Sequence, residues 1–303
     1  MAFVNAIAYH LPNRKISNKE IIDNFIPYSR GQGIAISEKD LFAKTGISFR
    51  FESELSQTAK DLGISAALNL FQKTDYFPSQ IEAVIFISDA IDYKGPSTAC
   101  IIQSELNLPQ SVMAFDVLQG CTGWVYGLSL AKGLIASHQV ENVLVITADT
   151  PRRVIHPEDL ELSALFSDGG AAAIVSSKPI ENSLNFKICK LKFGTNGNGS
   201  KYLYTERSAS KEPADIEWLS QYKEIASGLG GGRLRMNSDK IFLFALRIVP
   251  QLTKNILEQH DLSLDDIDLF VYHQANGVML EFLRKRMKIP KEKFIISIEN
   301  IGN

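Results

Sequence analysis

The sequence is poor in cysteine, with only Cys100, Cys121 and Cys189 among 303 residues. An odd number of widely spaced thiols does not suit a disulfide framework, and there is no Cys-x-x-Cys or paired-histidine motif to hold zinc. We therefore expect reduced thiols, a cytoplasmic location, and neither a metal nor another cofactor.

The chain also lacks an excess of positive charge, since 32 Lys and Arg face 34 Asp and Glu for a net charge of −2. This balance gives no electrostatic basis for binding nucleic acid or an anionic membrane. No apolar run reaches transmembrane length, and residues 1–10 have no basic region of a signal peptide and predict a strand instead. Neither glycine-dense stretch, at 169–170 or at 228–232, has the spacing of a nucleotide-phosphate loop.

The composition that remains, 45% hydrophobic and 22% charged, is ordinary for a globular protein of one or two domains. Within it, Cys121 has the most informative surroundings. An apolar run, Phe115 to Leu118, ends at Gly120, and a helix is predicted from Trp124 to about Ser137. A thiol at such a strand-to-helix turn is a candidate nucleophile, and the helix dipole predicts a lowered pKa for it. The alternative is a small buried residue.

Two later segments favour the nucleophile. The apolar run from Ile267 to Tyr272 leads to His273, and the run from Phe294 to Ile298 leads to a Gly-Asn pair that ends at Asn303. Ligands bind beyond the carboxyl ends of strands in open α/β sheets. We expect Cys121, His273 and Asn303 at such an edge.

The sequence contains two similar segments that lie far apart, which indicates an internal repeat. Residues 79–90 and 265–276 share a polar turn, an isoleucine, an acid and an apolar run, and each follows a predicted amphipathic helix, at 58–72 and 240–258. Each copy continues through a helix to a second strand and a glycine turn. This predicts two related α/β halves, at 1–178 and 179–303, each with a mostly parallel sheet.

The pieces between the repeats are less regular. We predict a loop at 28–33, a short helix ending near Lys44-Thr45-Gly46, and a tight turn rather than a ligand cradle at Asp168-Gly169-Gly170. The other histidines, His10, His138, His156 and His260, are interpreted as surface or structural residues.

At Cys121, His273-Gln274-Ala275-Asn276 and Asn300-Ile301-Gly302-Asn303, the chain resembles the β-ketoacyl-acyl-carrier-protein synthase III family of the thiolase superfamily. Further matches follow in family order over nearly the whole chain: Lys44 to Ile47, Gly95 to Cys100, Asp116-Val117, Phe166 to Ala171 and Arg235 to Asn237. The resemblance implies a thiolase-like α/β fold of two duplicated halves in a five-layer αβαβα arrangement, usually a homodimer.

The resemblance also implies a reaction, a decarboxylative Claisen condensation in fatty-acid or related secondary-metabolite synthesis. Cys121 is acylated by a thioester, His273 and Asn303 hold the carbonyl of a malonyl thioester, and decarboxylation yields the attacking carbanion. The expected partners are acyl and malonyl thioesters on CoA or on an acyl carrier protein. The basic run from Arg284 to Lys293 is a candidate docking surface for that acidic carrier, or simply a solvated face.

The expected substrate-binding residues are Asn276, Gly95, Lys44 and Asp40, and three of them depart from the family pattern. Asp40 and Lys44 replace a Trp and an Arg that contact CoA, and Gly95 replaces a Phe that closes the acyl pocket in acetyl-selective members. We therefore expect a primer other than acetyl-CoA. Family members also continue beyond the residue matching Asn303, so we expect the sequence to be incomplete there.

Three alternatives stay open. A papain-like protease has the same Cys-His-Asn order, but this chain has no Cys-Gly-Ser-Cys-Trp-like element and no signal peptide, and its Cys121 lies far from the N-terminus. An acyltransferase of the same fold would move the acyl group to an alcohol or amine without decarboxylation. A non-catalytic subunit of the same fold would only support a partner.

Overall fold

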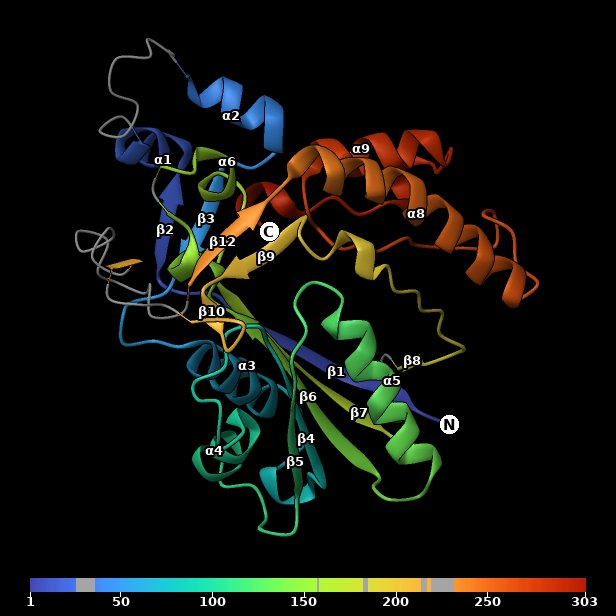
Figure 1. The fold of residues 1–303 in the computed structure, drawn as a ribbon. Coiled ribbons are helices and arrows are strands. Elements are labelled where there is room, and N and C mark those ends of the chain that lie inside the picture. The colour runs from blue at the N-terminus through green and yellow to red at the C-terminus, as the bar shows by residue number, and fades with distance from the viewer. Residues whose placement is uncertain (26–35, 157, 182–184, 214–216, 219–231) are drawn as a thin grey trace. The chain divides into compact units, whose positions relative to one another are not determined.

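A computed structural model describes residues 1–303 except 26–35, 157, 182–184, 214–216 and 219–231 (Figure 1). The described residues form two compact units, each assembled from separate stretches of the chain. The first unit comprises 1–14, 52–150 and 168–191, and the second comprises 15–51, 151–167 and 192–303. The loop predicted at 28–33 and most of the glycine-dense stretch at 228–232 lie outside the described residues. The boundary predicted at residue 178 divides the sequence repeat rather than these units and stays a prediction.

The first unit is built on a six-stranded sheet in the order β5-β4-β6-β7-β1-β8. Its elements are β1 (Phe3–His10), α3 (Ala59–Gln72), η2 (Pro78–Gln80), β4 (Ala83–Ile87), α4 (Thr98–Glu105), β5 (Met113–Val117), α5 (Gly123–Ala136), β6 (Asn142–Asp149), β7 (Gly169–Ser176) and β8 (Phe186–Lys187). The predicted strand at the N-terminus and the predicted helices at 58–72 and 124–137 are confirmed.

The sheet is mixed, whereas the strand–helix alternation predicted a mostly parallel one. β4 runs parallel to β5 and β6, but β7 is antiparallel to both β6 and β1. A parallel neighbour requires a crossover packed on the sheet. The residues between β6 and β7, 151–167, belong to the second unit, so β7 has no such crossover here and runs in the opposite direction.

Alternate residues of the central strands face opposite sides of this sheet, as the two-residue period of a strand requires. Val84 and Phe86 pack with α3 and α4, while Ala83, Ile85 and Ile87 pack with α5. All five residues of β4 are buried. Because both faces are covered, the strand reads in the sequence as a continuous apolar run rather than an alternating one.

The tight turn predicted at 168–170 is wrong, because Gly169 and Gly170 are the first two residues of β7 and pair within the sheet. The carboxylate of Asp168 accepts hydrogen bonds from the Ser53 backbone N–H, at 2.9 Å, and from the Ser53 hydroxyl, at 2.8 Å. A Cβ on Gly170 would lie 2.7 Å from the backbone of Leu62, so glycine lets β7 approach α3 closely. The motif therefore serves the packing of β7 rather than a tight turn.

The second unit has short strands and longer helices. Its elements are β2 (Arg14–Ser17), α1 (Asn18–Phe25), α2 (Glu38–Thr45), β3 (Phe49–Glu52), η3 (Pro151–Val154), α6 (Leu160–Ser163), η4 (Gly197–Gly199), β9 (Leu203–Glu206), β10 (Ser208–Ala209), β11 (Glu212–Pro213), β12 (Arg233–Met236), α8 (Ser238–Gln259), α9 (Gly277–Arg286), η7 (Lys291–Lys293) and η8 (Ile298–Asn300). The helices predicted at 240–258 and before Gly46 are confirmed.

The two apolar runs of the second half are shorter as strands than predicted. Phe270 and Phe294 form a parallel bridge, in which the Phe270 N–H donates to the Lys293 carbonyl at 2.7 Å and the Ile295 N–H to the Phe270 carbonyl at 3.2 Å. The parallel direction is therefore correct, but in the described part of the chain the pairing extends no further. Phe270 and Phe294 are both buried, and they pack with Leu280 of α9.

Candidate active site

The turn that carries Cys121 joins β5 to α5. Thr122 is the N-cap of α5, so Cys121 stands one residue before the helix, as predicted. A Cβ on Gly123 or on Gly127 would collide with the Ile87 side chain of β4. These two glycines therefore let the helix approach the sheet closely and fix the position of the turn.

Cys121 is solvent exposed and unpaired, but its pKa moves in the opposite direction from the one predicted. Loss of water around the thiol raises its pKa, and the carboxyl groups of Asp149 and Asp89 raise it further. Hydrogen bonding to the Cys121 backbone lowers the pKa, yet this effect is the smallest. The prediction of a lowered pKa was wrong because the helix start competes here with partial burial and two carboxyl groups.

These two carboxyl groups were not recognised in the sequence. Asp149 ends β6, where its Oδ1 accepts hydrogen bonds at 2.8 Å from the Ser88 hydroxyl and from the Asp89 backbone N–H. Burial and the charge of Asp89 raise the pKa of Asp149 to about 7. A motif search misses the pair because the two residues lie far apart in the sequence and meet only through the order of the strands.

The other two cysteines differ from Cys121 in their surroundings. Cys189 follows β8, and its carbonyl accepts from Lys132 Nζ at 2.6 Å. Cys100 lies in the first turn of α4, with its Sγ 3.1 Å from the Ser97 hydroxyl oxygen. Neither a helix start nor a preceding strand alone singles out Cys121. As predicted, Cys121 differs from the other two cysteines in lying in a turn that joins a strand to an α-helix.

His273 follows the Phe270–Phe294 bridge and precedes α9. Its side chain is exposed at the surface, yet burial by surrounding protein lowers the pKa of the imidazole. The ring is therefore neutral at pH 7, with one N–H to donate and one nitrogen to accept.

Gln274, beside His273, is a residue whose contribution the sequence did not reveal. Its Nε2 donates to the carbonyls of Tyr272 and Ile295, at 2.9 and 3.2 Å, and its Oε1 accepts from the Ser297 N–H at 2.9 Å. The amide thus continues the pairing of the two segments beyond the bridge. It ties the residue next to His273 to the segment that leads to Asn303.

Asn303 is held through its backbone. Its N–H donates to the Leu165 carbonyl at 3.1 Å, and its carbonyl accepts from the Ser167 N–H at 2.8 Å. Gly302 has a φ of +74°, in the left-handed region that favours glycine, and a Cβ there would lie 2.8 Å from the Ser167 Cβ. These contacts fix the turn through the backbone of Asn303, so its side chain is not needed to hold the turn.

The candidate residues divide between the two units. Cys121 and Gly95 belong to the first, and His273, Asn276, Asn303, Lys44 and Asp40 belong to the second. Within the described residues, no group of three or more His, Cys, Asp and Glu is arranged to hold a metal ion. No described helix is both long and apolar enough to cross a bilayer.

Comparisons with known proteins identify the family of this chain. The model of the 3-oxoacyl-[acyl-carrier-protein (ACP)] synthase III family matches residues 115–197, and the model of its C-terminal part matches residues 257–303. A β-ketoacyl-[acyl-carrier-protein] synthase III of Caldanaerobacter subterraneus subsp. tengcongensis is 32% identical over 267 residues, which are 88% of this chain and 77% of that protein. The chain belongs to the β-ketoacyl-acyl-carrier-protein synthase III family.

Solved structures support the same assignment. A 3-oxoacyl-(acyl-carrier-protein) synthase III crystal structure is 34% identical with a TM-score of 0.88, covering 100% of this chain and 87% of the other. The priming β-ketosynthase of the R1128 polyketide biosynthetic pathway is 26% identical with a TM-score of 0.83, covering 100% and 83%. The predicted thiolase-like α/β fold and the predicted class of acyl-transferring enzyme are thereby confirmed.

Two of the predicted substrate-binding residues lie on α2. Asp40 is exposed and completes a capping box, in which its carboxylate accepts from the Ser37 N–H at 2.9 Å and the Ser37 hydroxyl at 2.7 Å. These hydrogen bonds hold the pKa of Asp40 below its usual value. Lys44 is exposed in the last turn, which favours a cation there. Both residues thus have a local structural explanation.

Asn276 of the His-Gln-Ala-Asn motif has both ends of its amide occupied. Its Oδ1 caps α9 by accepting from the N–H groups of Val278, at 2.8 Å, and Met279, at 3.1 Å. Its Nδ2 donates to the Lys44 carbonyl at 3.1 Å, where α2 and α9 meet at two glycines, Gly46 and Gly277. These contacts assign Asn276 a structural role at the start of α9.

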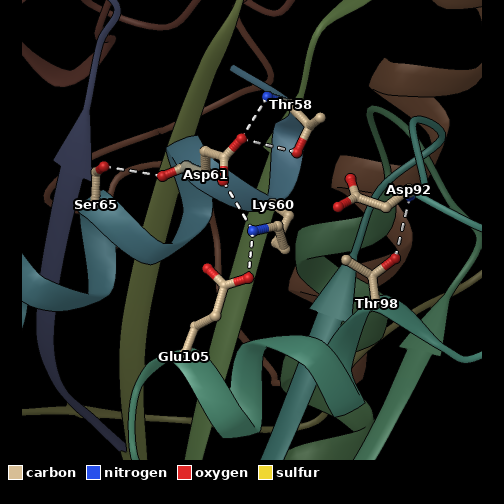
Figure 2. Close-up of polar contacts among 7 residues, drawn as sticks. All are labelled: Thr58, Lys60, Asp61, Ser65, Asp92, Thr98 and Glu105. Atoms are coloured by element: carbon tan, nitrogen blue, oxygen red, sulfur yellow. Dashed lines mark hydrogen bonds and ion pairs between the residues drawn. The ribbon is translucent and has the colours of Figure 1, made fainter. Parts of the chain in front are cut away.

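Gly95, also a predicted substrate-binding residue, is exposed, and a Cβ there would meet no atom of the described residues within 4 Å. The loop that carries it is anchored at α4, where the Asp92 N–H donates to the Thr98 hydroxyl at 3.4 Å. Figure 2 shows this contact beside Lys60, which joins α3 to α4 through Glu105 at 2.6 Å. The space next to Gly95 is therefore open within this chain, while the base of its loop is fixed.

Proposed function

We propose that this chain catalyses the decarboxylative Claisen condensation of an acyl primer, held on Cys121, with a malonyl thioester. The product is a β-ketoacyl thioester for fatty-acid or related synthesis. The observation that carries the proposal is Cys121 itself, an exposed thiol between β5 and α5 in a member of the synthase III family.

In the first half-reaction, the Cys121 sulfur attacks the thioester carbonyl of the primer, and the primer's own thiol leaves. The Cys121 backbone N–H, directly before the helix, is suited to stabilise the oxyanion of the tetrahedral intermediate. The acyl group then waits on the enzyme as a thioester.

In the second half-reaction, His273 and Asn303 donate hydrogen bonds to the carbonyl oxygen of the malonyl thioester. Loss of CO₂ converts this group into an enolate, whose oxygen carries the developing charge, and donors aimed at it lower the barrier. Since burial lowers the pKa of His273, the neutral imidazole is the donor at pH 7. The enolate carbon attacks the acyl-Cys121 carbonyl and releases the product.

We propose a primer that is longer or bulkier than acetyl. In the part of the chain that the structure describes, no side chain occupies the space at Gly95, and Asp40 offers no ring on which an adenine would stack. Loss of a stacking contact costs roughly 1–3 kcal/mol by analogy with base–aromatic stacking, which corresponds to about tenfold to a hundredfold in binding. The primer therefore depends less on CoA, and a carrier-bound thioester becomes competitive.

An acyl carrier protein is the proposed macromolecular partner. The end of α9 and the segment after it carry six Lys and Arg residues: Arg284, Lys285, Arg286, Lys288, Lys291 and Lys293. Glu281 pairs with Arg284 and Lys285, and Lys293 donates to a backbone carbonyl. Arg286, Lys288 and Lys291 are left as the proposed contacts for an acidic surface.

A homodimer is proposed from the sheet of the first unit. β5 is the outermost strand next to β4, and its other edge pairs with no strand in the described part of the chain. An open edge can pair with the same edge of a second copy. The unpaired thiols of all three cysteines support the proposed cytoplasmic location.

The test of the nucleophile is intact-protein mass spectrometry after incubation with a panel of acyl-CoA and acyl-carrier thioesters. We expect one added acyl group in the wild type and in Cys100→Ala, and none in Cys121→Ala. Label that persists in Cys121→Ala and is lost in Cys100→Ala or Cys189→Ala contradicts the assignment.

The test of the primer is competition between acetyl-CoA and medium or branched acyl thioesters. We expect the larger acyl groups to have the higher kcat/KM, and Gly95→Phe to restore a preference for acetyl. If acetyl-CoA wins by a wide margin in the wild type, the interpretation of Asp40 and Gly95 is wrong.

A further inference from the structure

Three strand ends of the first unit converge at one edge of the sheet. β4 is parallel to both β5 and β6, and Ile87 pairs with Val117 on one side and with Thr147 on the other. Asp89 lies two residues beyond this level, Asp149 two residues, and Cys121 four. Because parallel strands run side by side in the same direction (Figure 1), two carboxyl groups and the thiol emerge at the same edge.

Asp89 reaches the turn of Cys121 directly. Its Oδ2 occupies the space in which a Cβ of residue 120 would lie, so only glycine leaves room for the carboxyl group beside the cysteine. Asp149 holds the backbone of residues 88 and 89 in place, because its Oδ1 accepts hydrogen bonds from the Asp89 backbone N–H and from the Ser88 hydroxyl.

Two other carboxyl groups of the first unit have different surroundings. Asp116 accepts from the N–H groups of Thr98 and Ala99, at 2.6 and 2.7 Å, at the start of α4. Asp92 interacts with Thr58 and with Lys60, which is ion-paired with Asp61 and Glu105, and the Asp92 Oδ1 atom is buried without a hydrogen-bond partner among the described residues. Asp89 is solvent exposed, and within the described residues its carboxylate has no hydrogen-bond donor.

Loss of the Cys121 proton also depends on these two carboxyl groups. Thioester exchange on Cys121 needs the thiol to lose a proton, yet partial burial and the two carboxyl groups raise its pKa. Asp149, with its pKa raised to about 7, holds a proton more readily than an ordinary aspartate. Burial raises the pKa of Asp89 as well, which makes its carboxylate a stronger base toward the thiol. Of the two carboxyl groups, the more deeply buried Asp149 keeps a proton more readily, which leaves Asp89 as the acceptor.

We propose that Asp89 is the proton acceptor for the Cys121 thiol during acylation, with Asp149 as the residue that positions it; this rests on the proposed function of Cys121. As the Cys121 sulfur bonds to the acyl carbon, its proton moves to the Asp89 carboxylate. When the tetrahedral intermediate collapses, the bond from the acyl carbon to the departing sulfur breaks, and Asp89 returns the proton to that thiolate. Asp89 ends each cycle ionised, as it began.

Two rates measured on the same variant test this assignment. Alkylation of Cys121 by iodoacetamide across a pH series reports the fraction of thiolate, and single-turnover acylation by an acyl thioester reports the proposed proton transfer. In Asp89→Asn a negative charge is lost, so we expect the pKa of Cys121 to fall and alkylation at pH 7 to become faster. We expect acylation to slow about a hundredfold, the usual contribution of a positioned base. A purely electrostatic role would accelerate both reactions.

Matched variants complete the design. Asp89→Glu keeps the carboxylate and is expected to recover most of the acylation rate, while Asp89→Ser is a second neutral replacement. Asp75→Asn makes the same chemical change at an exposed position of the same unit and is expected to leave both rates unchanged. Acylation in Asp89→Asn and Asp89→Ser that is unchanged or faster overturns the proposal. A wild-type protein that takes no acyl group on Cys121 overturns the proposed function instead.

Discussion

The turn that carries Cys121 and the turn that carries Asn303 each place a glycine directly before the polar residue, but the two glycines are required for different reasons. Beside Gly120, the space for a side chain is filled by the carboxyl group of Asp89. Gly302 adopts a positive φ, and the residue after it exchanges two backbone hydrogen bonds with 165–167. One turn is fixed against charged side chains and the other by backbone geometry.

This difference predicts how each turn responds to change. A turn held against ionisable groups is sensitive to pH and to substitutions that alter charge, because each of those groups shifts the pKa of its neighbours. A turn held by backbone hydrogen bonds is insensitive to both, but it tolerates few changes in φ. The reactivity of Cys121 thus depends on the charges around it, whereas the position of Asn303 depends on backbone geometry.

The largest effect is expected for His273→Ala, which separates the two half-reactions. Cys121 and its neighbours are unchanged in this variant, so acylation should continue. Malonyl decarboxylation should fall about 10²–10³-fold, as it does when one oxyanion donor is removed. Burst acylation by mass spectrometry and CO₂ release from labelled malonyl thioester measure the two steps. Full condensation activity in the variant would reject the proposed role of His273.

A pH-dependent effect is expected at the Cys121 turn. The pKa of Asp149 is raised to about 7 in the folded protein, above its ordinary range near 4. The folded state therefore binds more protons than the unfolded state in this window, and stability falls as pH rises from about 4 to about 7. In the wild type, this loss in the free energy of unfolding is on the order of 2–4 kcal/mol. An asparagine cannot ionise, so Asp149→Asn should not show it.

Chemical denaturation at pH 5 and pH 8 measures this difference, with Asp75→Asn as the control. If the wild type and Asp149→Asn change in parallel between the two pH values, Asp149 does not titrate as proposed.

The two glycines give the direct test of the comparison. Gly302→Ala places a Cβ in a left-handed conformation and against Ser167, so it should lower the free energy of unfolding by about 2 kcal/mol. Gly120→Ala displaces the end of the Asp89 side chain, which can rotate away, so it should cost less stability but alter the alkylation rate of Cys121. Denaturant melts and iodoacetamide kinetics on both variants decide the matter. Equal losses of stability would mean that the turns are not held differently.

The smallest effect is expected at Asn276, where the question is structure or substrate. Asn276→Ala removes the cap of α9 and should cost about 0.5–2 kcal/mol of stability. Asn276→Asp keeps the cap acceptor but loses the donor to Lys44, so it should be intermediate. A variant with unchanged stability and a strongly raised KM for malonyl thioester would instead favour direct contact with substrate.

Much of the fold is readable from sequence because it depends on local patterns. The fully apolar run of β4 predicts a strand covered on both faces, and the periodicity of α3, α5 and α8 predicts helices within one or two residues of their ends. The direction of β7 was not predictable, because it depends on the path of residues 151–167. The short pairing of Phe270 with Phe294 was also missed, since an apolar run does not reveal how far its backbone is paired.

The candidate site shows the same division. Cys121, His273 and Asn303 are predicted from their positions at the ends of apolar runs. Asp89 and Asp149 were missed because their proximity to Cys121 is created by strand order and register. The pKa of Cys121 was predicted in the wrong direction for the same reason. The prediction considered only the helix that follows Cys121 and not the carboxyl groups on the neighbouring strands.

The close approach of α5 to β4 has a consequence for how this protein can vary. Gly123 and Gly127 lie so near Ile87 that any added methyl group at either position needs an equal volume removed from residue 87. These three positions should therefore covary among relatives and in selection experiments, with volume exchanged between strand and helix. A library that randomises residues 123 and 127 alone should return almost only glycine, whereas one that also frees residue 87 should recover alanine paired with a smaller side chain.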